Sequence, residues 1–391
     1  MQVDLAPLIF ELCTIVISAA VLGTLFLYAR QPIILAYIAS GMLIGPSGLA
    51  WIRSSEDITQ IGNLGVILLL FLIGLNLQPK KLISLFKESA FITLGTCCFF
   101  FTGTLIFALA IQLPLIDALI IAAALMFSST VIGLKLIPTT TLHHQRVGEM
   151  MTSILLMQDI LAISVIIFLN IGDGGNSLLL AFVMMLLKFA ALCSLAFLGV
   201  RHLILPLFRR FDVIQEYSFI TTLGWCLFWA ELSHQVGLSY ESGAFIAGIS
   251  IAVSRVSQAI SVHLKPLREF FLILFFFAIG ARMELSGSDF YSLLGVLFGA
   301  MLVAIKAWGF SKAFHLANEK PTMIQELSAR LSQASEFSFL VVYAAINANL
   351  LSMEASMFIQ TATMTTFVIS TYWVVKRFPT PISIASHLRQ D

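Results

Sequence analysis

Charged residues are scarce in this chain: 11% of its 391 residues are Asp, Glu, Lys or Arg, and 59% are apolar. A soluble domain carries about 25% charged residues, so this scarcity excludes an ordinary water-soluble protein. The formal net charge is only +1, and Lys and Arg are scattered through short segments. Nucleic-acid binding needs a basic surface, so we expect no nucleic-acid partner. From the apolar composition we expect an all-α polytopic membrane protein.

Cysteine is also sparse, and the five cysteines lie in apolar runs without metal-ligand spacing. This excludes a disulfide framework and a zinc site, and predicts small core residues. The chain lacks a catalytic cluster of His and Glu, so we do not expect an enzyme. Residues 377–391 lack a Gly-x-Gly-x-x-Gly motif, so no nucleotide or other cofactor site is expected within the chain. The cysteines are Cys13, Cys97, Cys98, Cys193 and Cys226.

Long apolar runs are what the sequence has in abundance. Crossing the hydrocarbon core takes about 20 apolar residues, and cutting the chain at charged, Pro and Gly clusters predicts thirteen transmembrane helices. Lys and Arg gather in alternate connecting segments, as the positive-inside rule requires, so we expect the N-terminus outside and the C-terminus in the cytoplasm. The expected spans are 5–28, 32–50, 61–78, 88–111, 114–136, 147–170, 178–206, 215–236, 238–255, 263–283, 289–316, 322–350 and 355–376.

A weak internal repeat relates the two halves of the chain. Residues 68–77 resemble residues 274–283 at an offset of 206, which superposes Gly74 on Gly280. The pair Ser40-Gly41 matches Ser242-Gly243 at an offset of 202. These matches relate each span to the seventh one after it, so the halves run in opposite directions. Inverted repeats are typical of secondary transporters with alternating access.

Polar residues interrupt the corresponding spans 5 and 12. Span 5 contains Ser128, Ser129 and Thr130, and span 12 contains Gln333-Ala334-Ser335-Glu336. Discontinuous helices at matching places of two repeats indicate an ion or substrate site. For the three residues of span 5 the alternative is a packing face of small residues. For Glu336 we favour a structural anchor, held by Arg330 or Ser338.

Asp159 follows Gln158 in the middle of span 6. A carboxylate at that depth is costly and marks a functional site. Leaving water makes an aspartate easier to protonate, whereas a bound cation favours its charged form. We therefore expect a proton and a monovalent cation to exclude one another at Asp159, with Gln158 offering an amide oxygen to the cation.

The motifs of this chain resemble those of the second monovalent cation/proton antiporter family, and most closely its Kef-type potassium/proton antiporters. The resemblance covers nearly the whole chain, which is similar to the membrane domain of those proteins. Ser335 departs from the pattern, which usually has glycine before Glu-Phe. The motifs are Gln31-Pro32, Tyr37–Gly41, Ile44–Pro46, Leu64-Gly65, Phe71–Leu75, Ser128–Thr130, Gln158-Asp159, Gly237–Ser239, Gly243–Gly248 and Glu336–Phe339.

The resemblance implies a sodium/proton-antiporter-like fold with two crossed discontinuous helices, acting as a homodimer in the bacterial inner membrane. Lys306 lies where relatives place a lysine that pairs with the carboxylate site. A cytosolic nucleotide-binding regulatory domain is expected to follow in such systems. The implied parts are the dimerisation domain (1–111, with spans 1–3 leading into core span 4, and 215–283), the core or transport domain (114–170 and 289–376), a linker helix (178–206) and a cytosolic tail (377–391).

We therefore expect an antiporter that exchanges potassium for protons. The ion and proton site would comprise Asp159, Gln158 and the three hydroxyl residues of span 5, with potassium at Asp159 and Gln158. Gln158 in place of a second carboxylate lowers the charge of the site, which favours potassium over sodium. A sodium/proton antiporter on the same fold and a passive cation channel are the alternatives. The inverted repeat and the single buried carboxylate favour a carrier over a channel.

Overall fold

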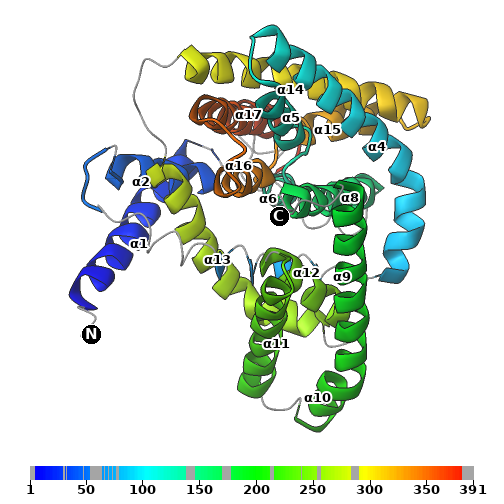
Figure 1. Ribbon diagram of the computed structural model, residues 1–391. Coiled ribbons are helices and arrows are strands. Elements are labelled where there is room, and N and C mark those ends of the chain that lie inside the picture. The colour runs from blue at the N-terminus through cyan, green and yellow to red at the C-terminus, as the bar shows by residue number, and fades with distance from the viewer. Residues whose placement is uncertain are drawn as a thin grey trace.

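The part of the chain that the computed structural model describes is helical (Figure 1). The described residues are 5–29, 31, 33–46, 48–52, 64–65, 67–68, 70–72, 74–75, 79–137, 146–169, 178–211, 215–238, 240–252, 257–282 and 290–380. The helices are α1 (Leu5–Tyr28), α2 (Ile33–Ile44), α4 (Pro79–Ala110), α5 (Leu115–Leu125), α6 (Thr130–Lys135), α8 (Arg146–Leu169), α9 (Leu178–Gly199), η1 (Val200–Ile204), α10 (Leu205–Phe211), α11 (Gln215–Gln235), α12 (Tyr240–Ala252), α13 (Ser257–Arg282), α14 (Phe290–Leu316), α15 (Pro321–Arg330), α16 (Phe337–Asn347) and α17 (Met353–Arg377).

These helices follow the apolar spans of the sequence. Apart from span 3, each expected span coincides with one helix, with two short helices for spans 5 and 12, or with α9, η1 and the start of α10 for span 7. Span 3, at 61–78, is described only at 64–65, 67–68, 70–72 and 74–75, and residues 381–391 of the tail lie outside the described residues, so the count of thirteen stays a prediction. Five described segments are long and apolar enough to cross a membrane by themselves: Ile9–Tyr28, Ser89–Ala110, Arg146–Ile166, Leu187–Phe211 and Phe290–Leu316.

The helices pack in two groups (Figure 1). In the first group, α14 and α17 pack together, and α4, α5, α8, α15 and α16 surround the two breaks of spans 5 and 12. In the second group, α13 packs against α2 and α11 packs against α12. Helix α9 extends from the level of α8 down to α10 and contacts α12 (Figure 1). The transport and dimerisation roles assigned to such groups above stay predictions.

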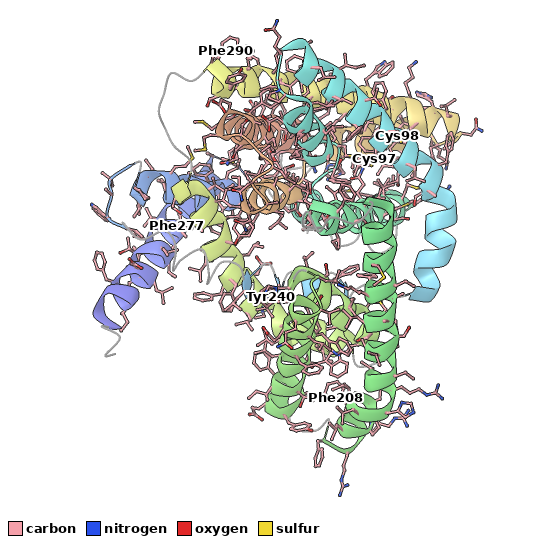
Figure 2. All side chains as sticks on the ribbon, in the orientation of Figure 1. Cys97, Cys98, Phe208, Tyr240, Phe277 and Phe290 are labelled. Atoms are coloured by element: carbon pink, nitrogen blue, oxygen red, sulfur yellow. The ribbon has the colours of Figure 1, made fainter. Side chains whose placement is uncertain are left out.

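Glycines bring α2 and α13 into direct backbone contact. A Cβ atom on Gly41 would lie 2.0 Å from the carbonyl oxygen of Phe277, and one on Gly280 would lie 2.0 Å from the carbonyl oxygen of Ile38. Both distances are far below van der Waals contact, so only glycine fits at these two positions. Figure 2 shows Phe277 on α13, in the part of that helix that lies beside α2.

The same contact recurs between span 3 and α12. A Cβ atom on Gly248 would lie 2.1 Å from the carbonyl oxygen of Phe71, and one on Gly74 would lie 2.6 Å from that of Phe245. The two contacts are related by the inverted repeat, since Gly74 corresponds to Gly280 as the sequence predicted. Gly41 corresponds in packing to Gly248 and not to the predicted Gly243, because a match of two residues does not fix the register of a repeat.

Replacing Gly280 with alanine should destabilise the protein by about 1–3 kcal/mol, the usual cost of overpacking, because the new methyl group overlaps the α2 backbone. Thermal unfolding in detergent measures the effect. Gly103 of α4 is the matched control, since a Cβ there meets nothing within 4 Å. Gly103→Ala should be neutral or slightly stabilising, because helical glycine is entropically unfavourable. Equal destabilisation by both substitutions would contradict the close contact.

Candidate cation site

Two helix breaks meet at the centre of the first group of helices. The first lies between the end of α5 at Leu125 and the start of α6 at Thr130, and the second between Arg330 and Phe337. The hydroxyl of Ser128 donates to the Leu331 carbonyl at 2.8 Å, which joins the two breaks directly. The interruptions predicted from polar residues in spans 5 and 12 are therefore confirmed.

Hydroxyl side chains replace the helical hydrogen bonds lost at each break. The Ser129 hydroxyl accepts from the amide of Ile132 at 3.0 Å and so caps the start of α6. The Ser335 hydroxyl accepts from the amide of Phe337 at 3.1 Å at the start of α16. Serine favours such caps because its short side chain reaches nearby backbone amides. These two residues therefore stabilise the broken backbone, and each hydroxyl oxygen keeps a second lone pair.

Asp159 is only 1% exposed and lies on α8 beside the first break. The hydroxyl of Thr130, the first residue of α6, donates to its carboxylate, at 2.9 Å from Oδ1 and 3.0 Å from Oδ2. Glu336, at the second break, is also buried, at 2% exposed. The sequence-predicted residues Asp159 and Thr130 therefore share one buried polar site.

Gln158 is fully buried, and both ends of its amide are used. Oε1 accepts from the backbone amide of Ser128 at 2.9 Å, and Nε2 donates to the Cys97 sulfur at 3.8 Å. Figure 2 shows Cys97 on α4. The amide oxygen retains one lone pair for a further partner. Gln158 therefore orients the break at Ser128, a role that the sequence did not suggest.

Lys306 was predicted to pair with Asp159, but in the structure it binds backbone carbonyls. Its fully buried ammonium group donates to the carbonyls of Leu125, at 3.4 Å, of Phe127, and of Gln333, at 3.0 Å. It also lies 5.4 Å from the ring centre of Phe100. The C-terminal end of α5 carries unpaired carbonyls and partial negative charge, so it attracts the lysine. In this structure, which describes both side chains, Lys306 does not pair with Asp159.

Glu336 and Arg330 are both buried, but the structure does not join them as predicted. Arg330 pairs with Glu326, one turn earlier on α15, at 2.7 Å. Glu336 is the residue that precedes α16, and it is 2% exposed. The hydroxyl of Ser338 donates to the carbonyl of Ala124 at 2.7 Å. Arg330 prefers Glu326 because the two residues are four apart on one helical face.

Three further residues complete the site, and two of them escaped the sequence analysis. Gln333 donates to the Ser129 carbonyl at 3.4 Å and accepts from the Ser370 hydroxyl at 3.3 Å. The Thr366 hydroxyl accepts from the amide of Ala334 at 2.9 Å. Ser370 and Thr366 lie on α17, a helix with many other hydroxyl residues, so the sequence does not single these two out.

The site can therefore hold one small cation or one proton. Its central group is a carboxylate removed from water, surrounded by hydroxyl, amide and carbonyl groups from three segments. Oxygen donors of this kind suit hard cations. Within the described residues no cluster of three or more His, Cys, Asp or Glu side chains has the geometry of a metal centre. The arrangement is compatible with the binding of a cation or of a proton at the Asp159 carboxylate.

The chain is similar in sequence to a known family of membrane proteins. A family model described as the transmembrane sodium/hydrogen exchanger matches residues 15–377. Proteins named glutathione-regulated potassium-efflux system protein KefC, from Cronobacter sakazakii and Klebsiella pneumoniae, are 29% and 30% identical to the chain over 336 and 338 residues. Each alignment covers 82% of this chain and 52% of the relative. The chain therefore spans about half the length of the curated relatives it matches.

A solved structure agrees with the fold. The sodium proton antiporter MjNhaP1 from Methanocaldococcus jannaschii, determined at pH 8, superposes with a TM-score of 0.73 and covers 99% of both chains. An electron-microscopy structure of the same protein gives a TM-score of 0.65. Sequence identity is 14% in both cases, so the likeness concerns the fold alone. The expected all-α, antiporter-like fold is confirmed.

Proposed function

Because the chain belongs to the sodium/hydrogen exchanger family, we propose that it exchanges potassium for protons across the membrane, with Asp159 as the shared site. The resemblance to Kef-type membrane domains inferred from the motifs agrees with the KefC relatives. Membership of this family supports a cation/proton antiporter. The choice of potassium, the shared aspartate and alternating access form the proposal itself.

One observation carries the proposal: Asp159 is buried beside the break of span 5 and is bonded there by Thr130. Removal from water disfavours the bare carboxylate, so the group holds either a proton or a cation. Either the proton or the cation neutralises the negative charge of the carboxylate, so the two do not bind together. Their mutual exclusion couples the two fluxes without any further element.

Gln158 supports potassium as the cation. Its neutral amide stands next to Asp159, where a second acidic residue would add negative charge. A site of lower charge binds a weakly hydrated cation with less competition from sodium. The KefC relatives carry potassium efflux in their names, whereas the fold neighbour is named as a sodium proton antiporter. The sodium/proton antiporter is therefore the second candidate.

Reconstitution in liposomes tests these alternatives. An outward potassium gradient should acidify the lumen when the protein is present, as read by an internal pH dye, and an equal sodium gradient should have a weaker effect. A stronger response to sodium would favour the second candidate. Potassium current without proton counterflow would indicate a passive channel and would remove the antiport proposal.

The wider setting follows the same proposal. We place the protein in the bacterial inner membrane as a homodimer, with the N-terminus outside and the C-terminus in the cytoplasm. The long apolar helices support the membrane location. The proposal also includes a cytosolic regulatory domain as a partner, since the matched region is 52% of the KefC relatives.

The Thr130 hydroxyl should matter for affinity more than for folding. Thr130→Val keeps the shape of the side chain and removes the donor to Asp159. A hydrogen bond to a charged group contributes about 1.5–3 kcal/mol, so the potassium concentration for half-maximal flux should change about tenfold or more. Thr130→Ser, which keeps the hydroxyl, is the control and should behave as the wild type. An unchanged potassium dependence in the valine variant would contradict the assigned contact.

A further inference from the structure

The guanidinium of Arg330 is completely buried at the C-terminal end of α15, and the exchange scheme does not use it. Nη2 contacts Glu326 at 2.7 Å, and Nε donates to the same carboxylate at 2.9 Å. Nη1 donates to the Leu136 carbonyl at 2.8 Å, and Nη2 donates to the Pro379 carbonyl at 2.7 Å. The three nitrogens thus join three segments that are far apart in sequence.

Leu136 caps the C-terminal end of α6, the short helix whose first residue contacts Asp159. Its carbonyl has no partner within the helix, and a cation is favourable at that end. Six residues of helix are about 9 Å long. Arg330 therefore binds the C-terminal end of α6, and the N-terminal residue of the same helix, Thr130, lies at the cation site.

Pro379 lies just after α17, in a segment that turns back into the protein. The chain becomes extended at Phe378, whose amide still bonds to Val374, and Thr380 is fully buried. This segment therefore packs inside the first group of helices when it leaves α17. Its carbonyl shares the Nη2 of Arg330 with Glu326.

We propose that Arg330 is a positioning residue of the cation site: by bonding the end of α6 to the segment Phe378–Thr380, it keeps Thr130 on Asp159, so that displacement of this segment changes cation affinity. This inference rests on the proposed function and adds a means of regulation to it. The ion pair with Glu326 alone does not explain the arrangement, because the Glu326 side chain is 19% exposed and partly hydrated. Arg330 directs two of its donors to carbonyls of other segments instead.

Two substitutions of Arg330 separate positioning from charge. Arg330→Gln removes the charge and the fork, whereas Arg330→Lys keeps the charge but cannot span both carbonyls. Both variants should raise the potassium concentration for half-maximal flux about tenfold, as losses of supporting contacts around an ion site commonly do. Both should also speed hydrogen exchange of the amides of α6. Glu326→Gln removes the charge of the pair, keeps an amide oxygen for the guanidinium and leaves both carbonyl contacts in place, so it is the control and should change both quantities less than either Arg330 variant does.

Wild-type affinity and exchange in Arg330→Gln would overturn the proposal. Full rescue by Arg330→Lys would also overturn it, since charge alone would then suffice. A fall in maximal flux alone, with unchanged potassium dependence and unchanged exchange in α6, would mean that the residue only supports folding. The exchange measurement needs no transport, so it judges Arg330 even where potassium flux through Asp159 is absent.

A variant that leaves Arg330 intact tests the other end of the link. Thr380→Trp places a large side chain at a fully buried position and should push the segment away from Arg330. We expect the same change in potassium dependence and in α6 exchange, with no further change when Arg330→Gln is added. Thr380→Ser is the matched control and should behave as the wild type. Additive effects of the two substitutions would show that the segment and Arg330 act separately, against the proposal.

Discussion

Asp159→Asn should reduce potassium-driven proton flux to the rate of protein-free liposomes. Asparagine keeps the size of the side chain but binds no proton at working pH and carries no charge for a cation. The Thr130 hydroxyl can still donate to the asparagine oxygen, so the fold should be retained. The measurement is luminal pH after a potassium gradient is imposed, with unfolding followed on the same preparation.

Asp117 provides the control for this result, because it is also a buried carboxylate, 4% exposed. It accepts from the amide of Ser352 at 3.1 Å and from its hydroxyl at 2.6 Å, at the start of α17. Asp117→Asn should cost about 1 kcal/mol of stability as a weakened cap and leave exchange intact. If Asp159→Asn still exchanged ions, or if both variants lost flux equally, Asp159 would not be the shared site.

Lys306→Met should have the largest effect on stability. Methionine fills the same volume but leaves the carbonyls of Leu125, Phe127 and Gln333 without their donor. An unpaired buried polar group costs about 1–3 kcal/mol, so the loss should be about 2–4 kcal/mol, seen as a lower unfolding temperature in detergent. Transport should fall with it, because both breaks lose a common support.

Lys312 on the same helix is the matched control, since it is exposed and lies 5.9 Å from the ring centre of Trp308. Lys312→Met should leave the unfolding temperature nearly unchanged. Should Lys306→Met unfold like the wild type yet shift the potassium dependence strongly, the lysine would instead act as the charge partner of Asp159 in another conformation. That outcome would restore the role that the sequence suggested.

The helices and the two breaks could be predicted from the sequence because both depend on local chemistry. Apolar runs of membrane-spanning length predict the spans, and of the two serines in the first break, Ser129 caps the helix that begins after it. Asp159 was found because a carboxylate is rare in an apolar span. These features need no knowledge of which segments meet in space.

Partners across the fold were harder to predict. Lys306 and Arg330 both bind backbone carbonyls at the ends of short helices, at Leu125 and Leu136, and a carbonyl is present at every residue, so the sequence does not mark the acceptor. The Gln158 amide also bonds Ser128 and Cys97, two partners that the sequence did not indicate. In each case the choice is made by tertiary packing, which a single sequence does not display.

The reciprocal glycine contacts limit how this molecule can change shape. Helix α2 of one repeat is fitted to α13 of the other, and span 3 of the first repeat is fitted to α12 of the second. Neither half of this framework can slide without driving carbonyls into glycine backbones. We therefore expect α2, α13, span 3 and α12 to behave as one rigid unit during the proposed exchange cycle. The helices around Asp159 would then move relative to this unit.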